Sequence, residues 1–313
     1  MIELIMVIVI LGIVSSIGSE IIANTYTNYL LQRATHRASL KTELAAQQIA
    51  NLLSYRIPGT TLARNPANLS DNRLVSDPTD ANDTTHTLLE WIGADNDGFS
   101  AALLPPWNGF CDVAASDQNK IITPGSKLRK ASTIFSNLAN GAVHPAIFFR
   151  KHDINKWVYS YDKTTVTTKY IEALKANNAP GCLGMVSSDA SCVSTVEIKN
   201  NEKLRFYNTT STSNPHKVIS EHYKLAWTAY AVRPVDNANG LFDLWLYYNY
   251  RPWEGTRLTT AGYTTIPHAT IITNVSVFKF AESGNTLRFK ICAQENIGED
   301  YNITICKEKA VSL

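Results

Sequence analysis

Two features of this chain have residue types and spacing that predict chemistry: one carboxylate inside an apolar run, and five cysteines. Glu3 lies within residues 1–16, MIELIMVIVILGIVSS, where no other charged residue occurs. An isolated carboxylate among apolar neighbours is costly, and acids within membrane segments usually face a partner rather than lipid. Glu3 is therefore a candidate binding residue, and its partner is the main question that the sequence raises.

The cysteines form two close pairs and one single residue. Cys182 and Cys192 lie in a segment rich in Gly, Ser and Asp, whereas Cys292 and Cys306 lie on two successive predicted strands. We expect a disulfide within each pair and Cys111 left free, because a cross-strand disulfide adds about 2–4 kcal/mol in an oxidising compartment. Zinc is the less favoured alternative, since no CxxC motif and no His cluster lies near these residues.

Catalytic motifs do not occur in the sequence. GxSxG, HExxH, GxGxxG and P-loop patterns are absent, and the seven His residues are scattered. Asp95-Asn96-Asp97-Gly98 invites comparison with a calcium loop, but the other positions where an EF-hand has acids are Gly93 and Leu104, so a polar turn is the better interpretation. We expect no enzymatic activity, no cofactor and no metal.

A run of aromatic residues near position 250 allows two interpretations. It could form a carbohydrate-binding platform, but aromatic residues at alternating strand positions belong more often to a core or a sheet surface. We favour the structural interpretation for the run, which comprises Trp245, Tyr247, Tyr248, Tyr250 and Trp253.

Composition limits the class of partner. The net charge is only +2, so bulk charge signals no nucleic acid. With 313 residues, 44% of them hydrophobic, the chain is long enough for an anchor and a globular region with a core. No second hydrophobic run approaches spanning length, so one membrane segment is expected at the start of the chain.

The apolar N-terminal run supports three interpretations. A secretory signal peptide would have a basic region first, but no Lys or Arg precedes Leu4. A plain membrane anchor fits better, since residues 4–23 are about long enough to span a bilayer, although the polar residues between Ser15 and Glu20 dilute the second half. The third interpretation is a resemblance to a known family.

The segment IELIMVIVILGIV is similar to the N-terminal segment of type IV pilins and type II secretion pseudopilins, and Ile2, Glu3 and Leu4 match the motif of that family as they stand. Family members carry a short basic leader, a Gly at the cleavage point and usually a Phe and a polar residue ahead of the position of Met1. The chain is therefore expected either to begin inside a longer precursor or to lack the first two residues of the mature protein. The resemblance implies cleavage by a prepilin peptidase, N-terminal methylation, and pairing of Glu3 with the N-terminal amine of a neighbouring subunit.

The residues after Ser19 predict a helix that continues beyond the membrane segment. Apolar residues from Ile22 to Leu53, Leu44 among them, recur near a 3.6-residue period, and Pro58-Gly59 is a strong stop signal. One helix from Met1 to about Arg56 would be roughly 85 Å long. Four basic residues would lie on its exposed side as a solvated face rather than a phosphate site: Arg33, His36, Arg37 and Lys41.

The rest of the chain predicts mainly strands. Residues 60–97 indicate a loop with one short apolar element at 87–92, and residues 169–177 could make a short helix. Hairpins are predicted from 146–150 with 157–161, and from 193–198 with 204–207. Further strands are expected at 223–232, 241–250, 270–280, 286–292 and 301–306.

These patterns predict an α+β fold in which a long N-terminal helix, with a membrane-spanning half and an amphipathic half, docks on an antiparallel sheet. The expected domains are 1–57, the helix, and 58–313, a periplasmic or extracellular globular domain that is mainly antiparallel sheet after about residue 128.

The resemblance implies a function for this architecture. It implies a minor pilin or pseudopilin in the bacterial inner membrane that assembles, helix to helix, with other subunits and contacts an inner-membrane assembly platform and lipid. Major pilins are usually about half this size, so an initiating or tip-proximal subunit is expected. The alternatives are a membrane-anchored periplasmic binding or adhesive protein and, less favoured, a tethered enzyme.

Overall fold

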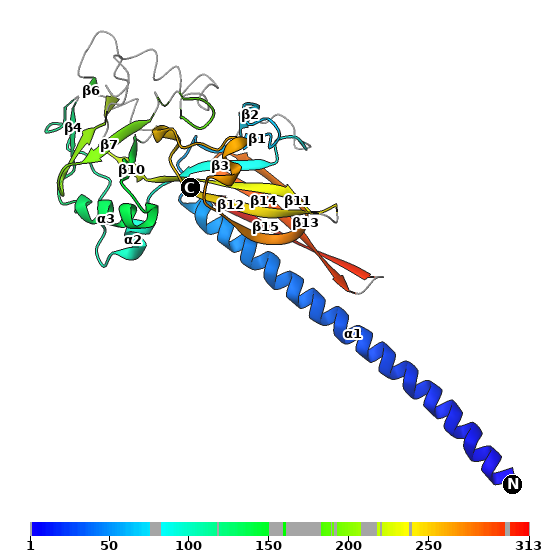
Figure 1. Ribbon diagram of the computed structural model, residues 1–313. Helices are drawn as coiled ribbons and strands as arrows, with labels where there is room; N and C mark the ends of the chain where they lie inside the picture. Colours follow the sequence, from blue (N-terminus) through cyan, green and yellow to red (C-terminus); the bar gives the residue numbers. More distant parts are fainter. Residues whose placement is uncertain are drawn as a thin grey trace.

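The computed structural model of the chain describes residues 2–75, 83–117, 119–149, 159–160, 183–188, 190, 193–207, 218–219, 221–237, 240–297 and 301–312. A single long helix, α1 (Ile2–Ser54), extends from one side of a region built mainly of antiparallel strands (Figure 1). The α+β fold predicted from the sequence is confirmed.

Helix α1 ends slightly earlier than the predicted end at about Arg56. The amide of Arg56 still bonds to the Leu53 carbonyl, but Arg56 also pairs with Gly93, and the Ile57 amide donates to the Ile92 carbonyl at 2.9 Å. The backbone therefore leaves the helix because residues 56 and 57 pair with Ile92 and Gly93 instead. Gly59, with φ of 77°, then makes the turn that the Pro-Gly pair predicts.

The larger sheet has eight strands in the order β15-β14-β13-β12-β11-β3-β1-β2. All of its pairs are antiparallel, and the three C-terminal strands are the longest. Its members are β1 (Leu62–Arg64), β2 (Asn72–Leu74), β3 (Leu88–Gly93), β11 (Thr228–Asp236), β12 (Phe242–Tyr250), β13 (His268–Ser283), β14 (Thr286–Ile297) and β15 (Tyr301–Ser312).

A second lobe lies beside the larger sheet (Figure 1). It contains a five-stranded antiparallel sheet in the order β10-β5-β7-β8-β4, a two-stranded sheet β6-β9, and two helices. The elements are α2 (Asp97–Ala101), β4 (Lys120–Ile122), α3 (Leu128–Ala139), β5 (Ala146–Phe149), β6 (Tyr159–Ser160), β7 (Ser194–Ile198), β8 (Lys203–Phe206), β9 (Val218–Ile219) and β10 (Tyr223–Ala226). Two 3-10 turns, η3 (Pro252–Glu254) and η4 (Ala261–Thr264), connect β12 to β13.

Two predictions for this region need correction. The hairpin of 146–150 with 157–161 is wrong, because β5 pairs with β10 and β7 while β6 pairs with β9. Because β5 lies between β10 and β7, Ala146 and Ile147 are almost completely buried. A hairpin with 157–161 would cover only one side of β5 and would bury less apolar surface. The predicted strand 223–232 divides at Trp227 into β10 and β11, which belong to different sheets.

Helix α3 was not predicted, although its buried residues Leu128, Ala131 and Phe135 have helical spacing. The hairpin of 193–198 with 204–207 is confirmed as β7-β8. The predicted helix at 169–177 lies outside the described residues.

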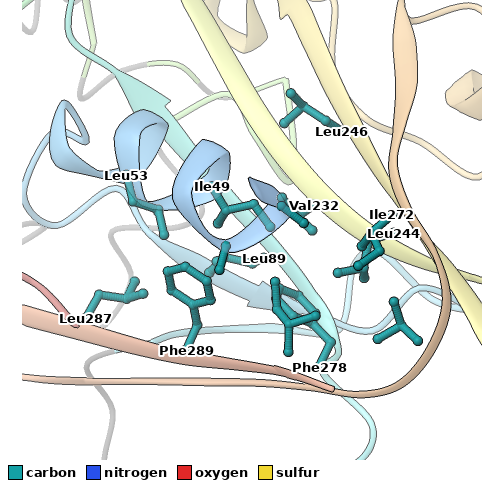
Figure 2. Close-up of a cluster of buried hydrophobic side chains, with 14 of the residues drawn as sticks. Ile49, Leu53, Leu89, Val232, Leu244, Leu246, Ile272, Phe278, Leu287 and Phe289 are labelled. Atoms are coloured by element: carbon teal, nitrogen blue, oxygen red, sulfur yellow. The ribbon is translucent and has the colours of Figure 1, made fainter. Parts of the chain in front are cut away.

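The second half of α1 packs on the larger sheet. Its buried residues start at Ala38, and small side chains such as Ala45 and Ala46 let the helix approach the strands closely. Figure 2 shows Ile49 and Leu53 facing Leu287 and Phe289 of β14. Leu44, expected on the apolar side, is instead 70% exposed, because it is two residues from both Thr42 and Ala46 and so lies on the side of the helix opposite the buried residues.

A buried ion pair and a hydrogen bond connect strands β1, β3 and β12. The Arg64 guanidinium pairs with the Glu90 carboxylate, which also accepts a hydrogen bond from the Tyr250 hydroxyl at 2.9 Å. Arg64 further donates to the Leu69 carbonyl. Since removing one partner of a buried pair leaves an uncompensated charge, each of these groups is needed once the others are present.

Truncation of Ile49 tests the docking of α1. Ile49→Ala is expected to lower the free energy of unfolding by about 2–4 kcal/mol, because Ile49 is fully buried against the sheet. Leu44→Ala, a matched change on the exposed side of the same helix, is expected to stay within about 0.5 kcal/mol of the parent protein. Denaturant unfolding of the full chain in detergent micelles measures both, and equal losses would show that α1 docks by another face.

Candidate assembly interface

The first half of α1 makes no buried contact with the rest of the described chain. No residue from Ile2 to Arg37 is buried, and the helix continues over this range for about 54 Å. In the part of the chain that the structure describes, α1 is the one helix long and apolar enough to cross a membrane. Its largest exposed aliphatic residues before Thr25 are Ile2, Leu4, Ile5, Met6, Val7, Ile8, Val9, Ile10, Leu11, Ile13, Val14, Ile17, Ile21 and Ile22.

Glu3 lies in the first turn of this exposed helix, between Ile2 and Leu4, which are 79% and 68% exposed. A carboxylate in the first turn is favoured by the helix dipole, but that effect contributes only about 0.3–1 kcal/mol. No Lys, Arg or His occurs between Ile2 and Gln32, so no side chain of this half can neutralise Glu3. A cation for Glu3 in apolar surroundings must come from another molecule or a chain terminus.

Along the axis of α1 the exposed residues are first mainly apolar, then include two tyrosines, and then include basic residues. The 22 residues from Ile2 to Ala23 span about 33 Å, close to the thickness of the hydrocarbon layer. Tyr26 and Tyr29 follow, 62% and 56% exposed, and tyrosine is typical of the level where lipid meets water. The exposed basic residues begin at Arg33. By composition the helix is therefore suited to hold the remaining part of the chain outside a bilayer.

Ion pairs connect α1 to the hairpin β14-β15. Glu295 lies 3.1 Å from the Lys41 ammonium and 3.6 Å from Arg37 Nε, and Glu43 pairs with Lys309 and lies 3.7 Å from Lys307. Two of the four basic residues predicted on a solvated face are thus paired. Such surface pairs contribute about 0–1 kcal/mol each, so they mainly orient the hairpin along the helix.

A buried arginine fixes the end of α1. One nitrogen of Arg56 donates to Glu282 at 3.2 Å and to the carbonyl of Asn285 at 2.9 Å, and the other donates to the Leu53 carbonyl. Arg56 therefore attaches the last turn of α1 to the connection between β13 and β14.

The five cysteines fall into three groups: a disulfide pair, one free residue and a pair outside the described residues. Cys292 and Cys306 lie opposite each other on β14 and β15 and form a disulfide. Cys111 is free and buried, and burial raises the pKa of its thiol to about 11, so the thiolate is scarce at neutral pH. The predicted pair Cys182 and Cys192 lies outside the described residues.

Asp95 and Asp97 are held by protein donors. Asp95 accepts hydrogen bonds from the Gly98 amide at 2.7 Å and from the Trp107 indole at 2.8 Å, and Asp97 accepts one from the Trp227 indole. A side chain at position 98 would overlap the Asp95 carboxylate, which accounts for Gly98. Among the described residues, no group of three or more His, Cys, Asp or Glu side chains could hold a metal ion.

The aromatic run near position 250 is mainly internal. Tyr247, Tyr250 and Trp253 are buried, Trp245 stacks on His268, and Tyr248 is 37% exposed. These five side chains therefore do not form an exposed platform, and the structural interpretation is confirmed.

The described residues also border an open groove of about 630 Å³ between residues 65–67, residues 83–87 and strands β11 to β13. Its charged lining residues are Asp83, Arg233, Asp236 and Lys279, so both signs are present. The groove does not select one class of ligand by charge.

Comparisons with protein-family models, with curated proteins and with solved structures find no match to this chain.

Peptide mapping under non-reducing conditions tests the cysteine assignment. A Cys292–Cys306 peptide is expected, together with a Cys182–Cys192 peptide, because both pairs are close in sequence or in space. Cys111 is expected to react with iodoacetamide only after unfolding, since it is fully buried. Recovery of Cys111 in a disulfide with any other cysteine would contradict the assignment.

Asp95 is expected to make stability depend on pH. Burial raises the pKa of this carboxyl from 3.8 to about 6 in the folded chain, with only 4% of the residue exposed. The folded chain then holds this proton more tightly than the unfolded chain, so the contribution of Asp95 to stability is fully present below about pH 4. That contribution, up to about 3 kcal/mol, is lost as the pH rises through 6.

The test is to measure unfolding free energy from pH 4 to 7 for the parent protein and for Asp95→Asn. The variant is expected to be less stable at pH 4, because an amide offers a single acceptor oxygen to the two donors, the Gly98 amide and the Trp107 indole, but its stability should decline less with pH. An unchanged decline would show that Asp95 is not the group responsible.

Proposed function

We propose that this chain is a pilin-like structural subunit, a minor pilin or pseudopilin, that assembles through the first half of α1 into a type IV pilus-like filament or a type II secretion pseudopilus. The observation that carries the proposal is Glu3: a carboxylate at the start of an exposed apolar helix that offers no cation before Arg33. A simple lipid anchor gains nothing from this acid, whereas a helix that packs against other helices can use it to set their register.

The energetics support a partner of opposite charge. A carboxylate left unpaired in apolar surroundings costs several kcal/mol, and pairing with a cation or strong donors offsets that cost. The resemblance of Ile2, Glu3 and Leu4 to the pilin motif implies that this cation is the N-terminal amine of a neighbouring subunit, produced by a prepilin peptidase. One such pair would select a single axial position of one helix against the next.

The remaining architecture agrees with this use. The Cys292–Cys306 disulfide suits an oxidising compartment, so the proposal places the strand-rich region in the periplasm or on the filament surface and α1 in the inner membrane before assembly. Other subunits, membrane lipid and an inner-membrane assembly platform are the implied partners. The large strand-rich region suits an initiating or tip-proximal subunit.

Replacement of Glu3 separates assembly from anchoring. Glu3→Ala is expected to insert into the membrane as well as the parent protein or better, because the helix becomes more apolar. Incorporation into filaments, or secretion that depends on them, is expected to fall at least about tenfold, since the charge pair is lost.

Glu20→Ala is the matched control, because it removes the other acid of the same exposed half from a position already diluted by polar residues. It is expected to keep assembly near the parent level. Filament yield and membrane-fraction immunoblots measure the two properties. Normal insertion together with normal assembly of Glu3→Ala would refute the proposal.

A further inference from the structure

A histidine and three charged groups form a cluster at the edge of the larger sheet. His86 lies two residues before β3, and its Nε2 is 2.9 Å from the Asp71 carboxylate while its Nδ1 is 2.7 Å from that of Asp83. Asp83 also pairs at 2.7 Å with Arg73 of β2, the edge strand of this sheet (Figure 1). The His86 ring therefore connects a residue just before β2 to a residue that follows it.

Both ring nitrogens of His86 face an acceptor. A neutral imidazole has one N–H group and one unprotonated nitrogen, so it can donate to only one of the two carboxylates. The imidazolium form donates to both. The arrangement therefore requires the charged ring, and in that form two positive groups, His86 and Arg73, balance Asp71 and Asp83.

The two carboxylates stay ionised in the pH range where histidine titrates. The hydrogen bond from His86 is the main cause that lowers the pKa of Asp71. Burial acts to raise the pKa of Asp83, but hydrogen bonds from the Thr85 and His86 amides and from the His86 ring lower it overall. Because histidine in water loses its proton near pH 6.5, the ring is the group of this cluster whose charge can change near neutral pH.

Loss of the ring proton would remove one of the two hydrogen bonds and leave a nitrogen lone pair against a carboxylate. The charges of Asp71 and Asp83 would also oppose each other, since the two groups are close enough for the charge of Asp83 to act on the pKa of Asp71. Arg73 holds Asp83 at either pH. We therefore expect the change to be confined to residues 84–87, between Asp83 and the start of β3.

Residues 84–87 form part of the wall of the open groove of about 630 Å³. Three of them line the groove: Thr84, Thr85 and Thr87. The charged lining residues besides Asp83 belong to β11 and β13 and are Arg233, Asp236 and Lys279. A rearrangement of residues 84–87 would therefore alter the shape of the groove.

We propose that His86 makes this groove sensitive to pH: the protonated ring connects Asp71 to Asp83 and holds residues 84–87 in place, and loss of the proton releases them. None of these residues belongs to α1, so the device is independent of the proposed assembly function.

Two NMR measurements on the full chain in detergent micelles test the proposal at pH 5 and pH 9. Nitrogen-15 spectra of the histidine rings show whether His86 is protonated at both nitrogens. The amino acid 4-trifluoromethylphenylalanine at the exposed position of Thr84 gives a fluorine-19 signal that reports on residues 84–87.

Three variants carry the same fluorine probe. His86→Arg keeps a positive charge and several donors at both pH values, whereas His86→Gln removes the charge. His36→Gln is the matched control, because it changes an exposed histidine of α1 far along the sequence from the cluster. Circular dichroism checks that each variant is folded.

At pH 5 we expect a His86 ring protonated at both nitrogens and one fluorine signal from the parent protein. At pH 9 at least about half of that signal should move to the position found in His86→Gln. The signal of His86→Arg should not move, and His36→Gln should behave as the parent protein does. A neutral ring at pH 5, a parent signal that is unchanged at pH 9, a pH response that persists in His86→Arg, or a response that is lost in His36→Gln would each overturn the proposal.

Discussion

The packing of the second half of α1 on β14 and the neighbouring strands is the contact on which the rest of the molecule depends. Ile49 and Leu53 enter the main core, and Arg56 attaches the end of the helix to the connection between β13 and β14. Because these contacts hold residues 38–56, the first half of the same continuous helix extends from the sheet with no support of its own. A stiff helix held at one end presents its apolar half, and Glu3, to whatever surrounds it.

The distribution of charge along α1 gives this arrangement a direction. Before Gln32 the charged residues are all acidic, and the basic residues start at Arg33. Two of these basic residues, Arg37 and Lys41, pair with Glu295 of β14. The cations are thus partly engaged with the strand-rich region, far along the helix from Glu3. This separation is why Glu3 needs a cation from outside its own helix in the proposed assembly, and why helices side by side in full register would oppose acid to acid.

The parts that could be predicted from sequence are those set by local pattern. The 3.6-residue period and Pro58-Gly59 predict α1 to within two residues of its end, and the cross-strand positions of Cys292 and Cys306 are read from two adjacent strands. The same pattern wrongly predicts Leu44 on the docked side, because apolar character alone does not show which side of the helix a residue occupies. Helix α3 was missed although the spacing of Leu128, Ala131 and Phe135 could have indicated it.

Contacts between distant segments could not be predicted. The pairing of β5 with β10 joins residues about 75 positions apart, and the ion pairs of Glu43 and Glu295 join α1 to strands more than 250 positions away. Local turn signals compete with such pairings, and the burial gained in the folded sheet decides the outcome, as it does for Ala146 and Ile147. The candidate site residue Glu3 could be predicted from the sequence, because a single charged residue within an apolar run is a local feature.

The charge state of Glu3 tests the central claim most directly. Solid-state NMR of the chain with carbon-13 at the Glu3 carboxyl can compare isolated chains in lipid vesicles with the assembled fraction at neutral pH. In the assembled fraction we expect an ionised carboxylate close to a nitrogen-15 label at a neighbouring N-terminus, because the pair offsets the cost of burying the charge. A protonated carboxyl with no nitrogen neighbour in that fraction would contradict it.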